Sequence, residues 1–354
     1  MKKNNPFTLT FGKQPVEYIS RYENTDSIMS TFQADHPVSQ TYLIEGVRGS
    51  GKTVLMTTIS KELSASDQWV IVDLNATQDL LYDLAAKLTD SCRRMPDLLK
   101  TGFTVSVAGF GLGMNTDHAP REASGVITEI FNVLKKRNKR VLITIDEVVI
   151  SRAMRRFASE FQIFVRNDYP IFLLMTGLYE NIYAIQNDPA LTFLLRAPKI
   201  RLEPLSINQI TKQYASIFRI DLSKANHLAV ITKGYAFAFQ ALGMLYYEYG
   251  ESLSLDEILS RLDDMLDDFV YRKIWEGLSG QERTILRSLT EKPAKVQELC
   301  RNISMTSATF SRYRDRLIKC GLLISTQHGY ISLALPRFSE VTRLYELIQE
   351  VPHP

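Results

Sequence analysis

Eight consecutive residues combine glycines with a lysine and a hydroxyl side chain. They are Gly46, Val47, Arg48, Gly49, Ser50, Gly51, Lys52 and Thr53. This spacing, G-x-x-x-x-G-K-[ST], is the P-loop or Walker A pattern, in which glycines let backbone N–H groups wrap around phosphate oxygens. A helix that follows would point its partially positive N-terminus at the same phosphates. We therefore expect this segment to bind ATP, with Lys52 reaching the β- and γ-phosphates and Thr53 ligating Mg²⁺.

A pair of carboxylates, Asp146 and Glu147, directly follows the mostly apolar residues 141–145, in the manner of a Walker B motif. Ligands of open α/β sheets bind at the carboxyl ends of the strands. There Asp146 could hold Mg²⁺, and Glu147 could orient or deprotonate an attacking water. The alternative is that the two side chains cap the next helix or lie in solvent. An adjacent Asp-Glu pair also favours an ATPase over a small GTPase.

Strands and helices alternate around these residues. Four short, mostly apolar runs are typical of buried strands: residues 41–45, 69–74, 141–145 and 171–175. Between them the chain has apolar residues at the spacing of a helix. This alternation predicts an α/β fold in which helices cover both faces of a parallel sheet. Residues 103–114 alternate like a strand or hairpin and are interpreted as an insertion at one sheet edge.

Length and composition set the remaining limits. A chain of 354 residues predicts two or three domains, and a net charge of +3 does not by itself indicate a partner. Three well-separated cysteines fit neither a disulfide framework nor a zinc site. No apolar run approaches the roughly 20 residues of a membrane span, and the start does not read as a signal peptide. We expect a soluble, cytoplasmic protein without a membrane partner.

The last part of the chain carries a second recognisable pattern. Ser279 to Glu282 form a capping box, and three helical stretches follow, the third running from about Ser307 to Lys319. Residues 322–333 then read as a hairpin that turns at His328 and Gly329. This order predicts a winged helix-turn-helix.

Helical geometry divides the third helix into two sides. Advancing about 100° per residue places Phe310, Tyr313 and Leu317 on the core side. The opposite side carries Thr309, Arg312, Arg316 and Lys319. A basic, exposed helix suits contact with the DNA backbone and major groove. A basic helix surface is also common without DNA, and protein contact remains the alternative.

These motifs resemble those of the AAA+ ATPases, in the branch that contains archaeal-type ATPases, origin-recognition-like initiators and signalling (STAND) ATPases. The resemblance implies an ATPase core over residues 1–195, an all-helical lid over 196–268 and a winged helix over 269–354. It implies that Thr176 occupies the polar "sensor 1" position at the end of a strand. It also implies that Arg21, in the segment Tyr18-Ile19-Ser20-Arg21, helps to seat the nucleotide base.

The chain departs from the family pattern in several places. Thr176 stands where asparagine is more usual, and Ala236 stands where the Gly-x-Pro segment of signalling ATPases has proline. Arg196 lies near the family's arginine finger and could act in a neighbouring subunit after self-association on ATP, or could simply pack on the surface. No arginine starts the sensor-2 helix, which predicts slow hydrolysis.

Two functions remain open from the sequence. In the first, the nucleotide state of a slow ATPase controls binding of double-stranded DNA by the winged helix. In the second, the protein is a nucleotide-dependent signalling switch whose winged helix contacts protein.

Overall fold

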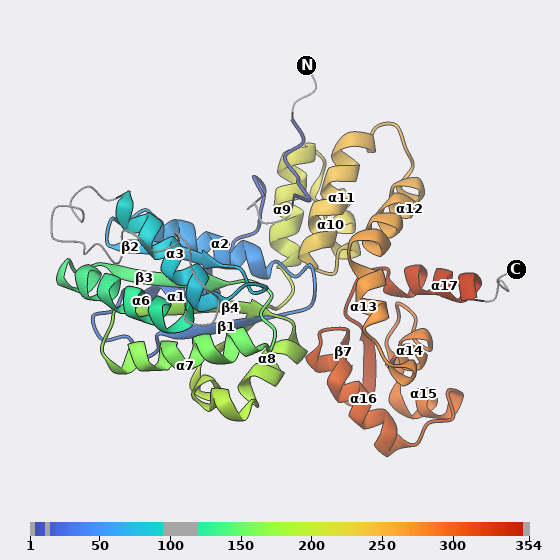
Figure 1. Ribbon diagram of the computed structural model, residues 1–354. Helices are drawn as coiled ribbons and strands as arrows, with labels where there is room; N and C mark the ends of the chain where they lie inside the picture. The colour runs from blue at the N-terminus through green and yellow to red at the C-terminus, as the bar shows by residue number, and fades with distance from the viewer. Residues whose placement is uncertain (1–3, 11–14, 95–118, 350–354) are drawn as a thin grey trace, which may run out of the picture. The chain divides into compact units, whose positions relative to one another are not determined.

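The computed structural model of the chain describes residues 4–10, 15–94 and 119–349 (Figure 1). The chain divides into two compact units. The sheet unit comprises residues 21–45 and the described part of 52–201. The helical unit comprises the described residues up to Ser20, the loop 46–51, and the described residues from Leu202 onward. The stretch 103–114, expected to be an insertion, lies outside the described residues.

Five parallel strands form the centre of the sheet unit, in the order β2-β3-β4-β1-β5. Their bounds are β1 (Thr41–Glu45), β2 (Trp69–Leu74), β3 (Arg140–Ile145), β4 (Ile171–Gly177) and β5 (Lys199–Arg201). The first four match the expected runs, whereas the three-residue β5 is too short to give a periodic signal. Because β4 lies between β1 and β3, the residues that end β4 lie beside those that follow β3.

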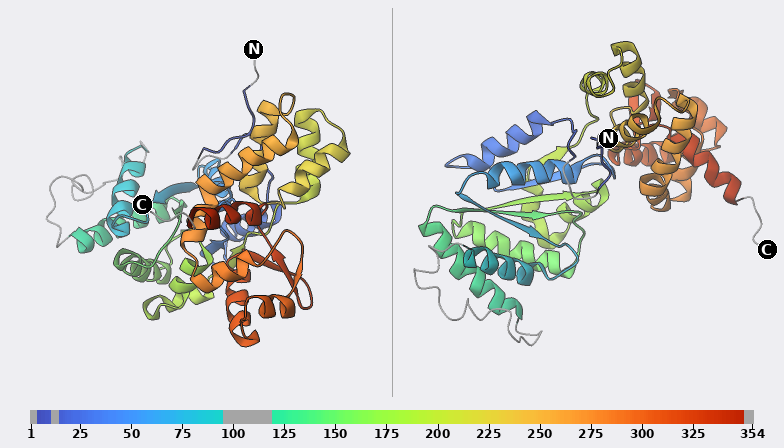
Figure 2. Two further views of the ribbon diagram at one scale, coloured as in Figure 1. Left: turned by 90° about the vertical axis from the view of Figure 1, so that its right-hand side faces the viewer. Right: turned by 90° about the horizontal axis from the view of Figure 1, so that it is seen from above.

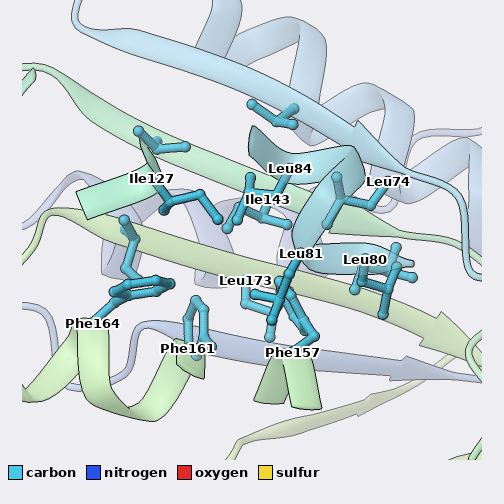
Figure 3. Close-up of a cluster of buried hydrophobic side chains, with 14 of the residues drawn as sticks. Leu74, Leu80, Leu81, Leu84, Ile127, Ile143, Phe157, Phe161, Phe164 and Leu173 are labelled. Carbon is cyan, nitrogen blue, oxygen red and sulfur yellow. The ribbon is translucent and has the colours of Figure 1, made fainter. Parts of the chain in front are cut away.

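Helices cover both faces of this sheet, as expected: α1 and α2 lie on one face, and α3, α6 and α7 on the other (Figure 2, right). The helices of the unit are α1 (Tyr22–Gln33), α2 (Lys52–Ser64), α3 (Leu80–Arg93), α6 (Ala119–Lys136), α7 (Arg152–Arg166), α8 (Tyr179–Gln186) and the 3₁₀ segment η1 (Pro189–Arg196). Figure 3 shows aromatic residues of α7 packed with leucine and isoleucine side chains of β2, β3, β4, α3 and α6. Burial of this apolar surface fixes the strands whose ends carry the candidate site.

The helical unit begins, after the loop 46–51, with four α-helices. They are α9 (Ile207–Phe218), α10 (Leu222–Ile231), α11 (Ala236–Tyr249) and α12 (Leu255–Leu266), followed by the π-helical segment η2 (Asp267–Tyr271) and α13 (Arg272–Glu276). Side-chain N-caps start three of these helices: Ser206 before α9, Asp221 before α10 and Ser254 before α12. The capping oxygens satisfy N–H groups that a helix start leaves without partners.

The C-terminal module, residues 279–335, follows the predicted order of helix, helix, helix and hairpin. Its elements are α14 (Gly280–Arg287), β6 (Ala294–Lys295), α15 (Val296–Asn302), α16 (Ser307–Lys319), β7 (Leu323–Gln327) and β8 (Tyr330–Leu333). The expected capping box at Ser279 and Glu282 is present. β6 adds a third strand to the hairpin, in the antiparallel order β6-β8-β7, and α17 (Phe338–Gln349) follows. Over the described ranges of the chain, no helix is long and apolar enough to cross a membrane.

Candidate functional site

Asp146 is the centre of a cluster at the carboxyl edge of the sheet. The Thr53 hydroxyl, one residue into α2, donates to Oδ2 of Asp146 at 2.7 Å. The Thr176 hydroxyl, near the end of β4, donates to Oδ1 of the same carboxylate. The structure therefore brings together three residues that were predicted separately, from three different elements of the sheet unit. A hydroxyl and a carboxylate at this separation are the hard oxygen ligands that Mg²⁺ prefers.

Glu147 lies in a turn that the same cluster holds in place. Its backbone has a φ of 51°, in the left-handed region that a residue with a Cβ rarely adopts. Its N–H donates to the Thr176 hydroxyl at 3.2 Å and to Oδ1 of Asp146 at 3.0 Å. The N–H of Val148 donates to the Thr176 carbonyl at 2.9 Å. Thr176 thus fixes a strained turn, and this turn leaves the Glu147 side chain exposed.

Asp73 joins this edge of the sheet and was not anticipated. It lies on β2 opposite Thr144 of β3, and the Thr144 hydroxyl donates to its Oδ1. The available signal was a single charged residue inside the apolar run 69–74. Its contact aligns the last residues of β3, which lead directly into Asp146.

The glycines of the loop 46–51 have the backbone conformations that the motif requires. Gly49 and Gly51 have φ values of 76° and 92°, in the left-handed region. A Cβ on Gly49 would also lie 2.2 Å from the Tyr235 hydroxyl oxygen, a separation that real atoms do not show. Lys52 and Thr53 then begin α2, as expected. Conformation and packing therefore both require glycine at position 49.

Residues at the start of α11, its N-cap Tyr235 and its second residue Phe237, hold the carbonyl groups of this loop. The Tyr235 hydroxyl donates to the Arg48 carbonyl at 2.5 Å, and the Phe237 N–H donates to the Gly49 carbonyl at 3.1 Å. Tyr235 is only 5% exposed, and burial raises the pKa of its hydroxyl far above the ordinary value, so the hydroxyl remains a donor. Sequence reasoning singled out this segment only for Ala236, and missed Tyr235 and Phe237 as contacts of the loop.

Two further arginines predicted at the site lie in the sheet unit. Arg21 precedes the first residue of α1 and is half-buried. Arg196 is exposed at the end of η1. Their roles, toward the nucleotide base and toward a neighbouring subunit, stay predictions.

The face of α16 predicted to contact DNA is populated as the helical geometry indicated. Phe310 and Leu317 are fully buried, whereas Arg312, Arg316 and Lys319 are exposed and Thr309 is half-buried. Their surroundings differ, however. Nη1 of Arg316 lies 2.6 Å from Oε1 of Glu282, a carboxylate that is itself 0% exposed.

Arg312 and Thr309 contact residues of α16 itself and of its N-cap. The guanidinium of Arg312 lies 5.0 Å from the ring centroid of Tyr313, its own neighbour in sequence. The N–H of Thr309 donates to the N-cap hydroxyl of Thr306 at 3.3 Å. Arg316 is therefore paired with a buried carboxylate, whereas Arg312 is exposed and lies over a neighbouring ring.

Comparison with solved structures gives the fold a context. The chain is similar to the ORC2 protein of Aeropyrum pernix in its ADPNP–ADP complexes, with 17% identity, a TM-score of 0.59, and coverage of 97% of this chain and 98% of that one. It is also similar to Cdc6p of Pyrobaculum aerophilum, with 15% identity, a TM-score of 0.51, and coverage of 96% and 97%. At these identities the likeness shows a shared fold. The fold class expected from the sequence, a parallel sheet covered by helices and followed by a helical region, is therefore confirmed.

Two sequence comparisons add little about function. A family model described as a domain of unknown function (DUF8462) matches residues 268–340. This match spans η2 to the start of α17 and so includes the whole C-terminal module. A comparison with curated proteins gives no match.

Proposed function

We propose that the chain binds ATP with Mg²⁺ and hydrolyses it slowly. The observation that carries this proposal is the cluster of Thr53, Asp146 and Thr176, in which the start of α2 and the ends of two neighbouring strands meet at one carboxylate. The glycine conformations of the loop 46–51 add support, because phosphate-binding loops need backbone that approaches closely. The Aeropyrum relative that shares the fold was solved with ADPNP and ADP.

The residues at this edge fit a Mg²⁺ ion bound together with a nucleotide. Thr53 would supply a hydroxyl ligand, and Asp146 would act directly or through water. Among the residues that the structure describes, no group of three His, Cys, Asp or Glu side chains could hold a metal. Mg²⁺ commonly takes its remaining ligands from phosphates and water, so a small protein donor set is appropriate. When bound, the ion would neutralise charge on the phosphates.

Glu147 is the residue proposed to act on the attacking water. The exposed carboxylate would orient that water and accept its proton, while the Thr176 contact keeps the turn in its left-handed conformation. Thr176 would thus act on the reaction through the position of Glu147 as well as through its own hydroxyl. Without an arginine at the start of the sensor-2 helix, charge on the phosphates would have one fewer partner, which favours slow turnover.

We further propose that the C-terminal module acts as a winged helix that binds double-stranded DNA through α16. Arg312 and Lys319, both exposed, would contact backbone phosphates, and Thr309 would lie beside them. Arg316 would contribute less, since it already pairs with buried Glu282. Arg196 would complete the site of a neighbouring copy if ATP promotes self-association.

The second candidate is a signalling switch whose C-terminal module contacts protein. The pairing of Arg316 with Glu282 favours this candidate, because it withdraws one of three exposed cations of α16 from a phosphate contact. In this case nucleotide would still alter partner binding, but affinity for DNA would be negligible.

The test of nucleotide binding compares the wild type with Lys52→Ala and with Lys61→Ala. Lys61 lies on the exposed side of the same helix and controls for loss of one charge. We expect Lys52→Ala to abolish Mg²⁺-dependent ATP binding and turnover while Lys61→Ala retains both. Full binding and turnover in Lys52→Ala would refute the proposal.

The test of DNA binding is a salt titration of duplex affinity with ATP, with ADP and without nucleotide. We expect affinity to fall steeply with salt, and the slope to decrease by about 2 in Arg312→Ala/Lys319→Ala, because each phosphate contact contributes about one unit. Lys273→Ala/Arg343→Ala removes the same charge from exposed sites on α13 and α17 and serves as the control. Absent or salt-independent binding would favour the switch.

A further inference from the structure

The turn 232–237, which joins α10 to α11 and includes the first two residues of α11, contacts two distant parts of the helical unit. On one side it holds the loop 46–51, and on the other it holds the C-terminal module. All three segments belong to the same compact unit. Because the turn contacts both, a change in the conformation of the loop can reach the module through it.

The contact with the loop acts on its peptide planes. A peptide unit is planar, so fixing a carbonyl also fixes the N–H of the next residue. The Tyr235 bond to the Arg48 carbonyl thereby sets the direction of the Gly49 N–H. The Phe237 bond to the Gly49 carbonyl likewise sets the Ser50 N–H, which donates to Val47 at 3.2 Å and closes the curve of the loop. Backbone N–H groups are what a phosphate-binding loop presents to its ligand.

The contact with the module is made by Lys233. Its Nζ lies 2.6 Å from a carboxylate oxygen of Glu291 and donates to the carbonyls of Leu333 and Leu335 at 3.0 and 3.4 Å. Glu291 follows α14, and Leu333 ends β8. One ammonium group thus joins the turn to two segments of the module, the one that follows α14 and the one at the end of β8.

The turn itself is held tightly enough to transmit a displacement. Lys233 and Gly234 have φ values of 47° and 73°, and the buried Thr232 accepts from the Tyr235 N–H through its carbonyl at 2.8 Å. The Leu205 N–H donates to the Gly234 carbonyl at 2.7 Å, and a Cβ on Gly234 would lie 2.4 Å from the Leu205 carbonyl oxygen. These bonds and close approaches restrict the backbone between Lys233 and Tyr235 to one conformation.

Val47 gives a second, direct link between loop and module. A Cβ built on Gly321, which directly follows α16 and its C-cap, would lie 3.5 Å from the Cβ of Val47. Val47 is also packed against the core that contains residues of α16, β7 and β8. A shift of the loop would therefore change the packing at the end of α16, the helix proposed to contact DNA.

We infer that Tyr235 is a positioning residue for the phosphate-binding loop, and that the turn 232–237 couples nucleotide binding to the placement of the C-terminal module. This inference rests on the proposed function, since it assigns the route by which nucleotide and module influence each other. Coupling is reciprocal: a change at the Lys233 contacts must alter nucleotide affinity by the same factor by which nucleotide alters those contacts.

The experiment measures the affinity of the full chain for a fluorescent N-methylanthraniloyl ATP with Mg²⁺. The variants are Tyr235→Phe, which removes one hydroxyl, Lys233→Met, which removes one ammonium, and the double variant. Tyr214→Phe is the matched control for the first, because the buried Tyr214 hydroxyl also donates to a carbonyl, that of Phe239 at 2.7 Å, away from the loop. Lys212→Met, at an exposed site on α9, is the control for the second.

We expect Tyr235→Phe to bind the nucleotide about three- to tenfold more weakly, the usual effect of one lost hydrogen bond. Lys233→Met, although the ammonium group that it removes bonds residues of the module, should change affinity by about threefold or more, and the double variant should be non-additive. Both control variants should bind like the wild type. Thermal melting of each variant identifies any that fail to fold.

A readout without substitution accompanies these measurements. Hydrogen exchange of residues 330–335 in the wild type should change when nucleotide is added, since Leu333 and Leu335 accept hydrogen bonds from Lys233. Wild-type affinity in Lys233→Met together with unchanged exchange would overturn the coupling, while nucleotide binding by the wild type would leave the proposed function standing. Wild-type affinity in Tyr235→Phe would overturn its positioning role. A wild type that binds no nucleotide, like Lys52→Ala, would refute the proposed function and the inference together.

Discussion

The carboxyl edge of the sheet and the exposed face of α16 both gather hydroxyl and charged side chains, but they hold them differently. At the sheet edge, Asp146 is bonded by Thr53 and Thr176, so candidate functional residues contact one another. On α16, Arg316 instead pairs with Glu282, a buried residue of the helix cap. A substitution at the sheet edge should therefore act mainly on ATP turnover. Loss of Arg316 should instead act on the stability of the chain as well as on binding of a partner.

The largest expected effect belongs to the sheet edge. Glu147→Gln keeps the size of the side chain but removes the proton acceptor, and should lower ATP turnover by about 100-fold or more. Nucleotide affinity should stay within about threefold of the wild type, because the loop and the Mg²⁺ ligands are unchanged. Steady-state phosphate release and equilibrium nucleotide binding check the two parts.

Glu62→Gln, at an exposed site on α2, is the control for the loss of one carboxylate. It should turn over like the wild type. Turnover by Glu147→Gln within a few fold of the wild type would remove Glu147 from the mechanism and leave the cluster as a binding site alone.

Arg316→Ala should have the next largest effect, and on stability. It leaves the Glu282 carboxylate buried without its ion-pair partner. Because the Arg316 side chain is 43% exposed, we expect a loss of about 2 kcal/mol in the free energy of unfolding, less than a fully buried pair would cost. Arg312→Ala should change it by less than about 0.5 kcal/mol. Urea unfolding measures both.

A second substitution separates the ion pair from other effects of Arg316. Adding Glu282→Gln to Arg316→Ala removes the buried charge and retains a side chain that can complete the capping box. The double variant should recover part of the lost stability. If Arg316→Ala and Arg312→Ala were equally stable, the pair of Arg316 with Glu282 would not stabilise the chain. The proposed difference between α16 and the sheet edge would then be wrong.

Thr176→Val sharpens the account of the sheet edge, with a smaller expected effect. The buried hydroxyl bonds Asp146 and accepts from the Glu147 N–H, so its loss should destabilise the chain by about 1–2 kcal/mol. It should also lower turnover about tenfold, since the turn that carries Glu147 loses its support. Thr176→Ser retains the hydroxyl and should retain most of the turnover. Equal turnover in the two variants would show that the hydroxyl does not position Glu147.

The two regions also differ in how far the sequence could predict them. The P-loop spacing and the apolar run before Asp146 each specify a strand end, and strand ends in a parallel sheet meet at one edge. The contact of Thr53 with Asp146 was therefore predictable in kind. The helical period of residues 307–319 placed Arg312, Arg316 and Lys319 on one face correctly. It could not identify Glu282 as the partner of Arg316, because periodicity within one helix carries no information about another.

The contacts of the loop 46–51 show where sequence reasoning ended. Tyr235 reaches Arg48 across 187 positions of the chain, and neither residue belongs to a pattern that names the other. The capping serines and the hairpin turn at His328 and Gly329 were predictable because each depends on neighbours within a few residues. Long-range contacts of a buried hydroxyl depend on packing of the whole helical unit. Asp73 was missed for the same reason, since its partner Thr144 lies on another strand.

Glu45 offers the smallest expected effect and tests the electrostatics of the strand that leads into the loop. It ends β1 and is buried, and this burial raises the pKa of its carboxyl, although Lys199 and Arg201 of β5 partly oppose the shift. A raised pKa means that the folded chain holds this proton more tightly than the unfolded chain. Stability should therefore fall as pH rises above the ordinary value of about 4.3, until the folded carboxyl has also ionised.

Glu45→Gln removes this titration, so its stability relative to the wild type should rise with pH. The two chains should be close at about pH 4, and the variant should be more stable by about 1 kcal/mol or less near neutral pH. Urea unfolding without nucleotide, repeated across this range, measures the difference. Glu23→Gln, on the exposed side of α1 in the same unit, should show no such trend. A variant less stable than the wild type near neutral pH would mean that Lys199 and Arg201 outweigh burial, and that the Glu45 carboxylate stabilises the strand entering the loop.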